Sequence, residues 1–130
     1  MTWQMPKTDW KPTDFHNADD YNRQAGNIMY IANVVLPALA YPVQVYISTV
    51  TRQDMRRAEW YIHLEEGLAA IESSGVPLPP EWKPRRIWTV PTWQDANRWE
   101  GNVLAIYNMA QRIAAEWPRM GTFESGGMLI

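Results

Sequence analysis

One short pattern occurs three times in the chain and predicts where helices begin. Each copy has a helix-capping residue, an aspartate three positions later and an arginine three positions beyond that; the copies are Asn17, Asp20 and Arg23; Thr51, Asp54 and Arg57; and Thr92, Asp95 and Arg98. Asn or Thr at a helix start accepts a hydrogen bond from a free backbone N–H, and Asp in the first turn favours the helix dipole. Asp and Arg at this spacing pair on a helix surface for only about 0.2–0.5 kcal/mol. The pattern therefore predicts helix starts rather than a metal or acid–base site.

The first and third copies agree further than capping requires. At an offset of 75 residues, the same types recur in the pairs Asn22 and Asn97, Gly26 and Gly101, Asn27 and Asn102, and Asn33 and Asn108. Glycine inside a helix costs up to about 1 kcal/mol relative to alanine, so the glycine pair predicts close helix–helix approach. We expect the asparagines to bind loop or neighbouring backbone. The middle copy lacks the Gly-Asn pair.

Apolar residues recur at intervals of three and four after each helix start. This spacing predicts helices over 17–36, 51–74 and 92–117, with Pro37, Gly75 and Pro118 marking their ends. Residues 1–16 would form an N-terminal arm and 118–130 a flexible tail. The alternating stretch 43–47 fits a short strand or an extended arm. We predict one all-α domain over 1–130, a three-helix bundle-like repeat with long connections rich in Pro and Trp.

Eight tryptophans are more than one small core readily encloses. Some are therefore expected at an interface with another protein, together with the apolar end of the tail; the candidates are Trp3, Trp10, Trp82, Trp88, Trp93, Met128, Leu129 and Ile130. Stacking of exposed tryptophans on sugar rings is the alternative interpretation. The tail itself is either a frayed terminus or a segment that docks in a groove.

Several function classes are disfavoured by composition and spacing. A net charge of −2 argues against a nucleic-acid partner, and the absence of cysteine fits synthesis in a reducing cytoplasm. The apolar stretch 28–47 is interrupted by Pro37 and Pro42, so we expect no membrane span. His16 and His63 do not form a metal-ligand pattern, and Glu65 and Glu66 diverge on a helix. We expect no catalytic site, metal or cofactor.

The segment from Thr8 to Arg23, TDWKPTDFHNADDYNR, resembles a recurrent motif of small structural proteins in tailed phages and prophages of Gram-positive bacteria. The likeness is tight over residues 8–33 and looser over 88–108. That family usually continues Asn-Arg-Ile-Glu; Gln24 and Ala25 depart from this, whereas Trp99 and Glu100 come closer. The family is associated with tail, baseplate or fibre genes, and its motif carries no catalytic residues.

Three functions follow as hypotheses. The resemblance implies a virion protein of the tail tip, baseplate or fibre, made in the host bacterial cytoplasm and assembling with other virion proteins and with itself. The surplus tryptophans leave open a module that binds cell-wall glycan. A lysis-related or enzymatic protein is the third.

Overall fold

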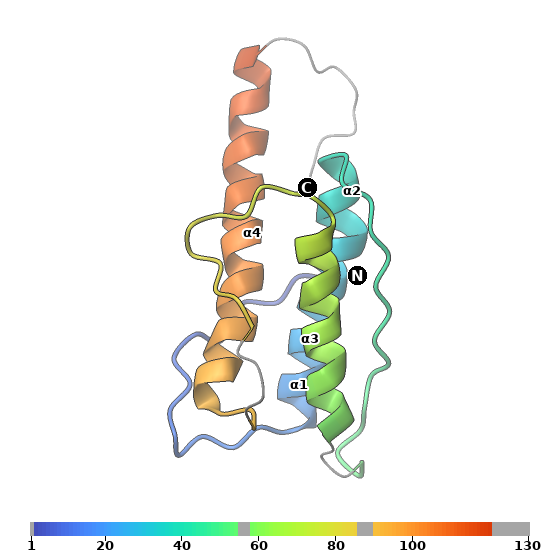
Figure 1. Cartoon of the computed structure of the whole chain (residues 1–130), viewed down its shortest axis with the longest axis vertical. Coiled ribbons are helices and arrows are strands. Elements are labelled where there is room, and N and C mark those ends of the chain that lie inside the picture. Colours follow the sequence, from blue (N-terminus) through green and yellow to red (C-terminus); the bar gives the residue numbers. More distant parts are fainter. Residues whose placement is uncertain (1, 55–57, 86–89, 121–130) are drawn as a thin grey trace.

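The computed structural model describes residues 2–54, 58–85 and 90–120, with 117–120 described by their backbone alone. Its elements are α1 (Ala18–Tyr30), the π-helical turn η1 (Ile31–Val35), α2 (Leu36–Ala38), α3 (Ala58–Ser73) and α4 (Trp93–Met120). The first three elements follow one another without a break, so the described residues form three long helices that lie side by side (Figure 1). The fold is all-α, as predicted.

The first helix begins as its capping pattern predicts but ends later. Asn17 and Asp20 each accept a hydrogen bond from the other's backbone N–H, which forms a complete capping box. The predicted end at Pro37 is wrong, because the helix continues to Ala38. Proline cannot donate to the carbonyl one turn earlier, and the wider η1 turn before it, in which the N–H of Leu36 bonds to the oxygen of Ile31, accommodates this loss. The chain then reverses at Ala40, whose φ is 71°.

The other two helices also differ from their predicted bounds. Thr51 to Asp54 forms a turn rather than a helix, closed by a 3.0 Å hydrogen bond from the Asp54 N–H to the Thr51 oxygen. Helix α3 begins at Ala58; Arg57 of the repeated pattern lies outside the described residues. Helix α4 passes through Pro118 to Met120, so the tail does not begin at 118. Residues 121–130 lie outside the described part of the chain.

The stretch 43–47 is an extended arm, because the described ranges contain no strand. It belongs to the segment 41–50, which follows α2 and runs back along the helices towards the start of α3 (Figure 1). Ile47 is buried, and Val43 and Val45 are half-buried against the core. Helix side chains take the place of a neighbouring strand, as shown below.

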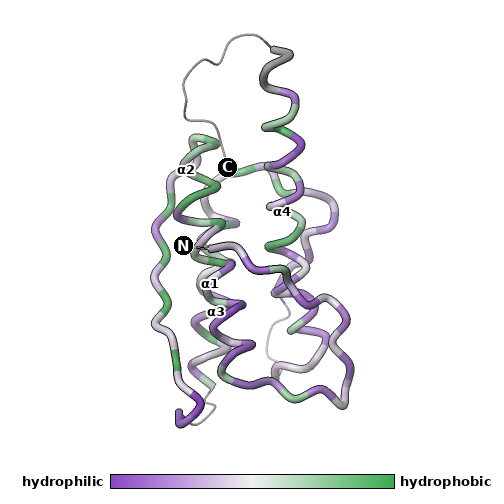
Figure 2. Tube along the Cα trace, turned by 180° about the vertical axis from the view of Figure 1, so that it is seen from behind, coloured by the Kyte–Doolittle hydropathy of each residue, from purple (hydrophilic) through white to green (hydrophobic). Residues whose placement is uncertain are grey.

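The apolar faces of the three helices meet in one core. Apolar and polar residues alternate along each helix in Figure 2, as expected for helices with one face against the others. The core includes one apolar set from each helix and two tryptophans; these residues are Ile28, Ile31, Leu36, Leu64, Leu68, Ile71, Val103, Ile106, Ala110, Trp60 and Trp99. The last turns of α4 project beyond the other helices (Figures 1 and 2).

The repeated glycines do not mark a close helix–helix approach, so that prediction is wrong. A Cβ atom built on Gly26 or Gly101 meets no heavy atom within 4 Å. The close approach is instead at Gly67 of α3, where an added Cβ would lie 2.7 Å from Cγ2 of Ile28. This contact joins α3 to α1.

The glycines should therefore respond to alanine in opposite directions. We expect Gly67→Ala to lower the free energy of unfolding by about 1–3 kcal/mol, because Ile28 must move. Gly101→Ala should raise it by up to about 1 kcal/mol, because alanine favours the helix and meets nothing. Urea denaturation followed by circular dichroism measures both changes. A stabilised Gly67→Ala variant would contradict the close contact.

Because Tyr21 is buried, we expect the free energy of unfolding to fall at alkaline pH. Its side chain is 1% exposed, its ring centroid lies 4.8 Å from that of Trp60, and burial raises its pKa to about 12. Because the pKa is higher in the folded than in the unfolded chain, this stabilisation is complete below pH 10 and is lost as the pH rises towards 12. At about 1.4 kcal/mol per pH unit, the loss approaches ~2.7 kcal/mol. Urea denaturation at pH 8 to 12 should show a shallower decline for Tyr21→Phe; equal slopes would refute the assignment.

Candidate functional site

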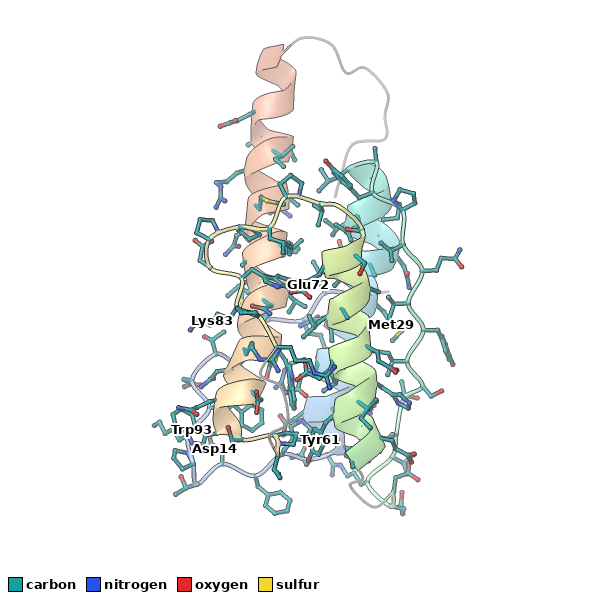
Figure 3. All side chains as sticks on the ribbon, viewed as in Figure 1. Asp14, Met29, Tyr61, Glu72, Lys83 and Trp93 are labelled. Atoms are coloured by element: carbon teal, nitrogen blue, oxygen red, sulfur yellow. The ribbon has the colours of Figure 1, made fainter. Side chains whose placement is uncertain are left out.

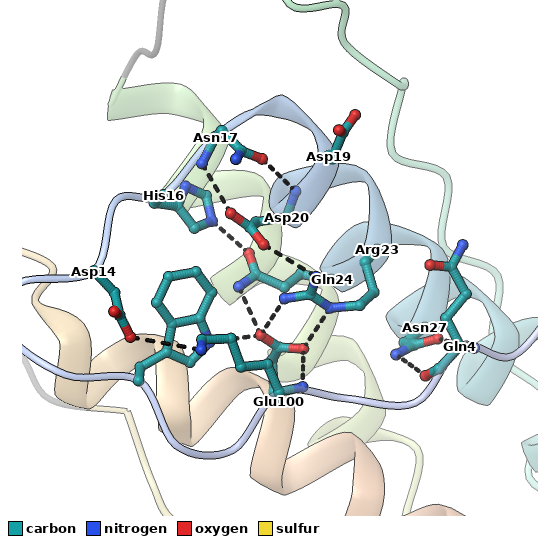
Figure 4. Close-up of polar contacts among 12 residues, drawn as sticks. Gln4, Asp14, His16, Asn17, Asp19, Asp20, Arg23, Gln24, Asn27 and Glu100 are labelled. Atoms are coloured by element: carbon teal, nitrogen blue, oxygen red, sulfur yellow. Dashed lines mark hydrogen bonds and ion pairs between the residues drawn. The ribbon is translucent and has the colours of Figure 1, made fainter.

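Glu100 is a buried carboxylate between α4 and α1. Its side chain is 1% exposed and accepts two hydrogen bonds from Arg23, from Nε at 2.8 Å and from Nη2 at 2.7 Å. Three further donors complete its surroundings (Figure 4): the Lys7 N–H at 2.8 Å, Trp10 Nε1 at 2.7 Å and Gln24 Nε2 at 3.2 Å. The carboxylate is thus fully used in holding the N-terminal arm and α1 against α4.

A second buried ion pair joins α4 to α3. Arg98 binds Glu65 through Nη2 and also contacts Asp95 Oδ1 at 3.3 Å. Trp99 donates its Nε1–H to the same Glu65 oxygen at 3.1 Å. All three charged side chains are at most 10% exposed.

The arginines of the two ion pairs occupy equivalent positions in the repeat, but their glutamate partners do not. The predicted pairing of Asp20 with Arg23 and of Asp95 with Arg98 is confirmed. Sequence reasoning missed the second partner of each arginine, a buried glutamate on another helix. The hydrogen bonds that Arg23 donates to Glu100 raise the pKa of Arg23, against the opposing effect of burial. Both arginines therefore join two helices and do not pair only along the surface of their own helix.

Five of the six repeated asparagines bind backbone, as predicted, whereas Asn108 is exposed and makes no hydrogen bond to the described residues. Asn22 donates from Nδ2 to the Val50 oxygen at 2.7 Å and accepts from the Val50 N–H at 2.9 Å. Asn33 makes the same two bonds with Val45, at 2.7 and 2.9 Å. A carboxamide has the donor and acceptor of a peptide group, so each asparagine binds one extended residue as a neighbouring strand would. We call this double bond an asparagine contact.

Three more asparagine contacts hold the other connections to the helices. Each joins one asparagine to both backbone groups of one residue: Asn27 to Gln4 at 2.9 and 2.8 Å, Asn97 to Trp10 at 2.7 and 3.0 Å, and Asn102 to Lys83 at 2.8 and 2.9 Å. The N-terminal arm is thereby fixed to both α1 and α4. The proline-rich segment before α4 is fixed to α4.

Several of the tryptophans predicted at an interface make contacts within the chain instead. Trp3 stacks on Tyr107 with ring centroids 4.2 Å apart, Trp10 is buried beside Glu100, and Trp82 donates to Glu72 at 2.7 Å. Among the tryptophans whose side chains are described, only Trp93 is exposed, at 37%. Trp88, Met128, Leu129 and Ile130 lie outside the described residues. A role of these residues at an interface stays a prediction.

An aromatic pocket of about 270 Å³ opens beside Trp93. Aromatic rings from the arm, α3 and α4 form much of its lining, namely Trp10, Tyr61, Trp93 and Trp99. Asp14, His16 and Thr92 add polar groups. Figure 3 shows Trp93, Asp14 and Tyr61 at the end of the molecule where α4 begins. Such a lining suits a ring or an apolar side chain that carries hydroxyl groups.

The histidines and paired glutamates do not assemble into a metal site in the described ranges. No group of three His, Asp or Glu side chains there could hold a metal ion. His16 Nε2 lies 2.7 Å from Gln24 Oε1, and Glu65 is buried while Glu66 is exposed, so the two glutamates diverge as predicted. None of the described helices is both long and apolar enough to cross a membrane.

Comparison of the chain with protein-family models, with curated proteins and with solved structures finds no match in any of the three.

Proposed function

We propose that this chain is a structural protein of a tailed phage or prophage particle, in the tail tip, baseplate or fibre. It is made in the host cytoplasm and assembles with other virion proteins and with copies of itself. The observation behind this proposal is the role that residues of the repeated motif play in the structure. Asp20, Asn22 and Arg23, which lie in the segment that resembles the phage motif, cap a helix, bind a connection and join two helices, respectively. These roles are architectural.

The surface offers a place for a protein partner where α1 and α4 begin. Phe15 is 74% exposed and Val90 is 82% exposed, and the exposed Trp93 lines the same pocket as Val90. Phe15 lines an adjoining pocket that shares His16 with the first. Exposed apolar side chains gathered in one patch mark interaction sites more often than scattered ones do. We call Phe15, Val90 and Trp93 the apolar end patch.

Particles purified from the strain that encodes the chain test this proposal. We expect mass spectrometry to find the chain in wild-type particles, and the double variant Phe15→Ser, Val90→Ser to be depleted at least about tenfold, which corresponds to ~1.4 kcal/mol of lost binding. Tyr46→Ser is the matched control, because Tyr46 is exposed and lies outside the patch. Wild-type chain that is expressed but absent from particles would reject the proposal.

The aromatic pocket favours glycan binding as a second candidate. Titration calorimetry with soluble cell-wall oligosaccharides should then give binding that Trp93→Ala weakens about tenfold, the effect of one lost ring stack of ~1.4 kcal/mol. Tyr46→Ala again serves as the control. Absence of heat with the wild-type chain would remove this candidate. No observation in the described residues favours a lysis-related or enzymatic role.

A further inference from the structure

The extended segment 43–48 is bound to the first helix along one of its two edges. The N–H and C=O of Val45 bind Asn33 at 2.9 and 2.7 Å, and the N–H of Ile47 lies 3.3 Å from the sulfur of Met29. In extended backbone, successive residues direct their N–H and C=O groups to opposite edges. Every second residue of the segment therefore faces the helix, and the residues between them face the other way.

The other edge is formed by the N–H and C=O groups of Gln44, Tyr46 and Ser48, which we call the open edge. None of these groups makes a hydrogen bond to a residue in the described ranges. The segment runs along the outside of the molecule (Figure 1), and a groove of about 370 Å³ is lined by this segment and by His63 and Glu66 of α3. A further extended chain can therefore reach the open edge.

The sequence of the segment lacks the features that usually protect an exposed edge. Strands at the edge of a sheet commonly carry charged residues or proline, which discourage pairing with another chain. Residues 43–50, VQVYISTV, contain neither, and five of the eight are β-branched. Such a composition is typical of segments that pair with another strand.

We propose that the open edge pairs antiparallel with the open edge of a second copy of this chain. Pairing about Tyr46 places Tyr46 opposite itself and Gln44 opposite Ser48 of the other copy, so that each facing pair exchanges two N–H···O bonds. This register uses the whole of the open edge, and a two-fold axis makes one surface its own complement. No like charges meet within the pair, because 43–50 carries none. The inference rests on the self-assembly proposed above and names the surface for it.

Sedimentation velocity of the purified full chain tests the pairing. We expect a weak dimer with a Kd of about 10–100 µM, because an edge of this length buries little area. Tyr46→Lys and Tyr46→Glu should each raise the Kd about fivefold or more, because pairing about Tyr46 puts like charges directly opposite each other. An equimolar mixture of the two variants should return the Kd to within about twofold of the wild-type value, because the facing charges then attract.

Two further variants separate backbone pairing from side-chain contacts. Tyr46→Ser keeps the backbone groups and adds no charge, so its Kd should stay within about threefold of the wild-type value. Tyr46→Pro removes the N–H that faces the other copy and should abolish the dimer. This N–H makes no bond to the described residues, so the helices should remain folded, which circular dichroism checks.

Each other outcome overturns the proposal. A wild-type chain that stays monomeric at about 1 mM has no such dimer. A dimer that both charged variants form as tightly as the wild type is held elsewhere, and one that is lost only in Phe15→Ser, Val90→Ser belongs to the apolar end patch. A mixture that does not recover rejects the register about Tyr46. Because these measurements use purified chain, their failure is distinct from absence of the chain from particles.

Discussion

Glu100→Gln should lower the free energy of unfolding by about 3–5 kcal/mol, the usual cost of breaking a buried ion pair by removing one of its charges. Arg23, whose side chain is 17% exposed, would keep its charge and its pair with Asp20, while its two bonds to the buried carboxylate become bonds to a neutral amide. The new NH₂ group would also face N–H donors, because all five hydrogen bonds to Glu100 come from N–H groups. Urea denaturation followed by circular dichroism measures the change.

Glu72→Gln is the matched control for this substitution. Glu72 is exposed and accepts one bond from Trp82, which an amide oxygen can replace, so we expect a change within about 0.5 kcal/mol. Arg23→Met should also be strongly destabilising, and the double variant should cost less than the sum of the two by about 0.5–3 kcal/mol. A loss below about 1 kcal/mol in Glu100→Gln would contradict the buried ion pair.

Arg98→Met should destabilise the chain by a similar 3–5 kcal/mol. The substitution leaves the buried carboxylate of Glu65 with Trp99 Nε1 as its remaining donor in the described ranges. Adding Glu65→Gln should recover part of the loss, because it removes the buried charge and keeps an acceptor for Trp99. The same denaturation experiment measures both variants.

Arg52→Met shows what the same substitution does at the surface. Arg52 pairs with Asp19 at 2.7 Å, but the two side chains are 81% and 63% exposed. Such a pair contributes about 0–1 kcal/mol, so the control should barely change. If Arg52→Met and Arg98→Met cost the same, burial of the second ion pair does not matter for stability.

The features that could be predicted from sequence are the local ones. The capping box of Asn17 and Asp20 closes within four residues, and the apolar periodicity of each helix repeats within two turns, so both are visible in a short window. The first and last helices continue past Pro37 and Pro118, the prolines that were expected to end them. Both lie in the last turns of their helices, where few backbone bonds remain to be lost.

The sequence by itself determined that the chain is helical, where two of its helices start, and that most of its repeated asparagines bind backbone. Only the tertiary structure decided which backbone each asparagine binds and which carboxylate each arginine meets. Arg23 and Glu100 are 77 residues apart, and Asn97 and Trp10 are 87 apart. Pairings over such separations depend on how the helices pack, because no local pattern encodes the partner. For the same reason the close approach lies at Gly67, which the repeat does not mark.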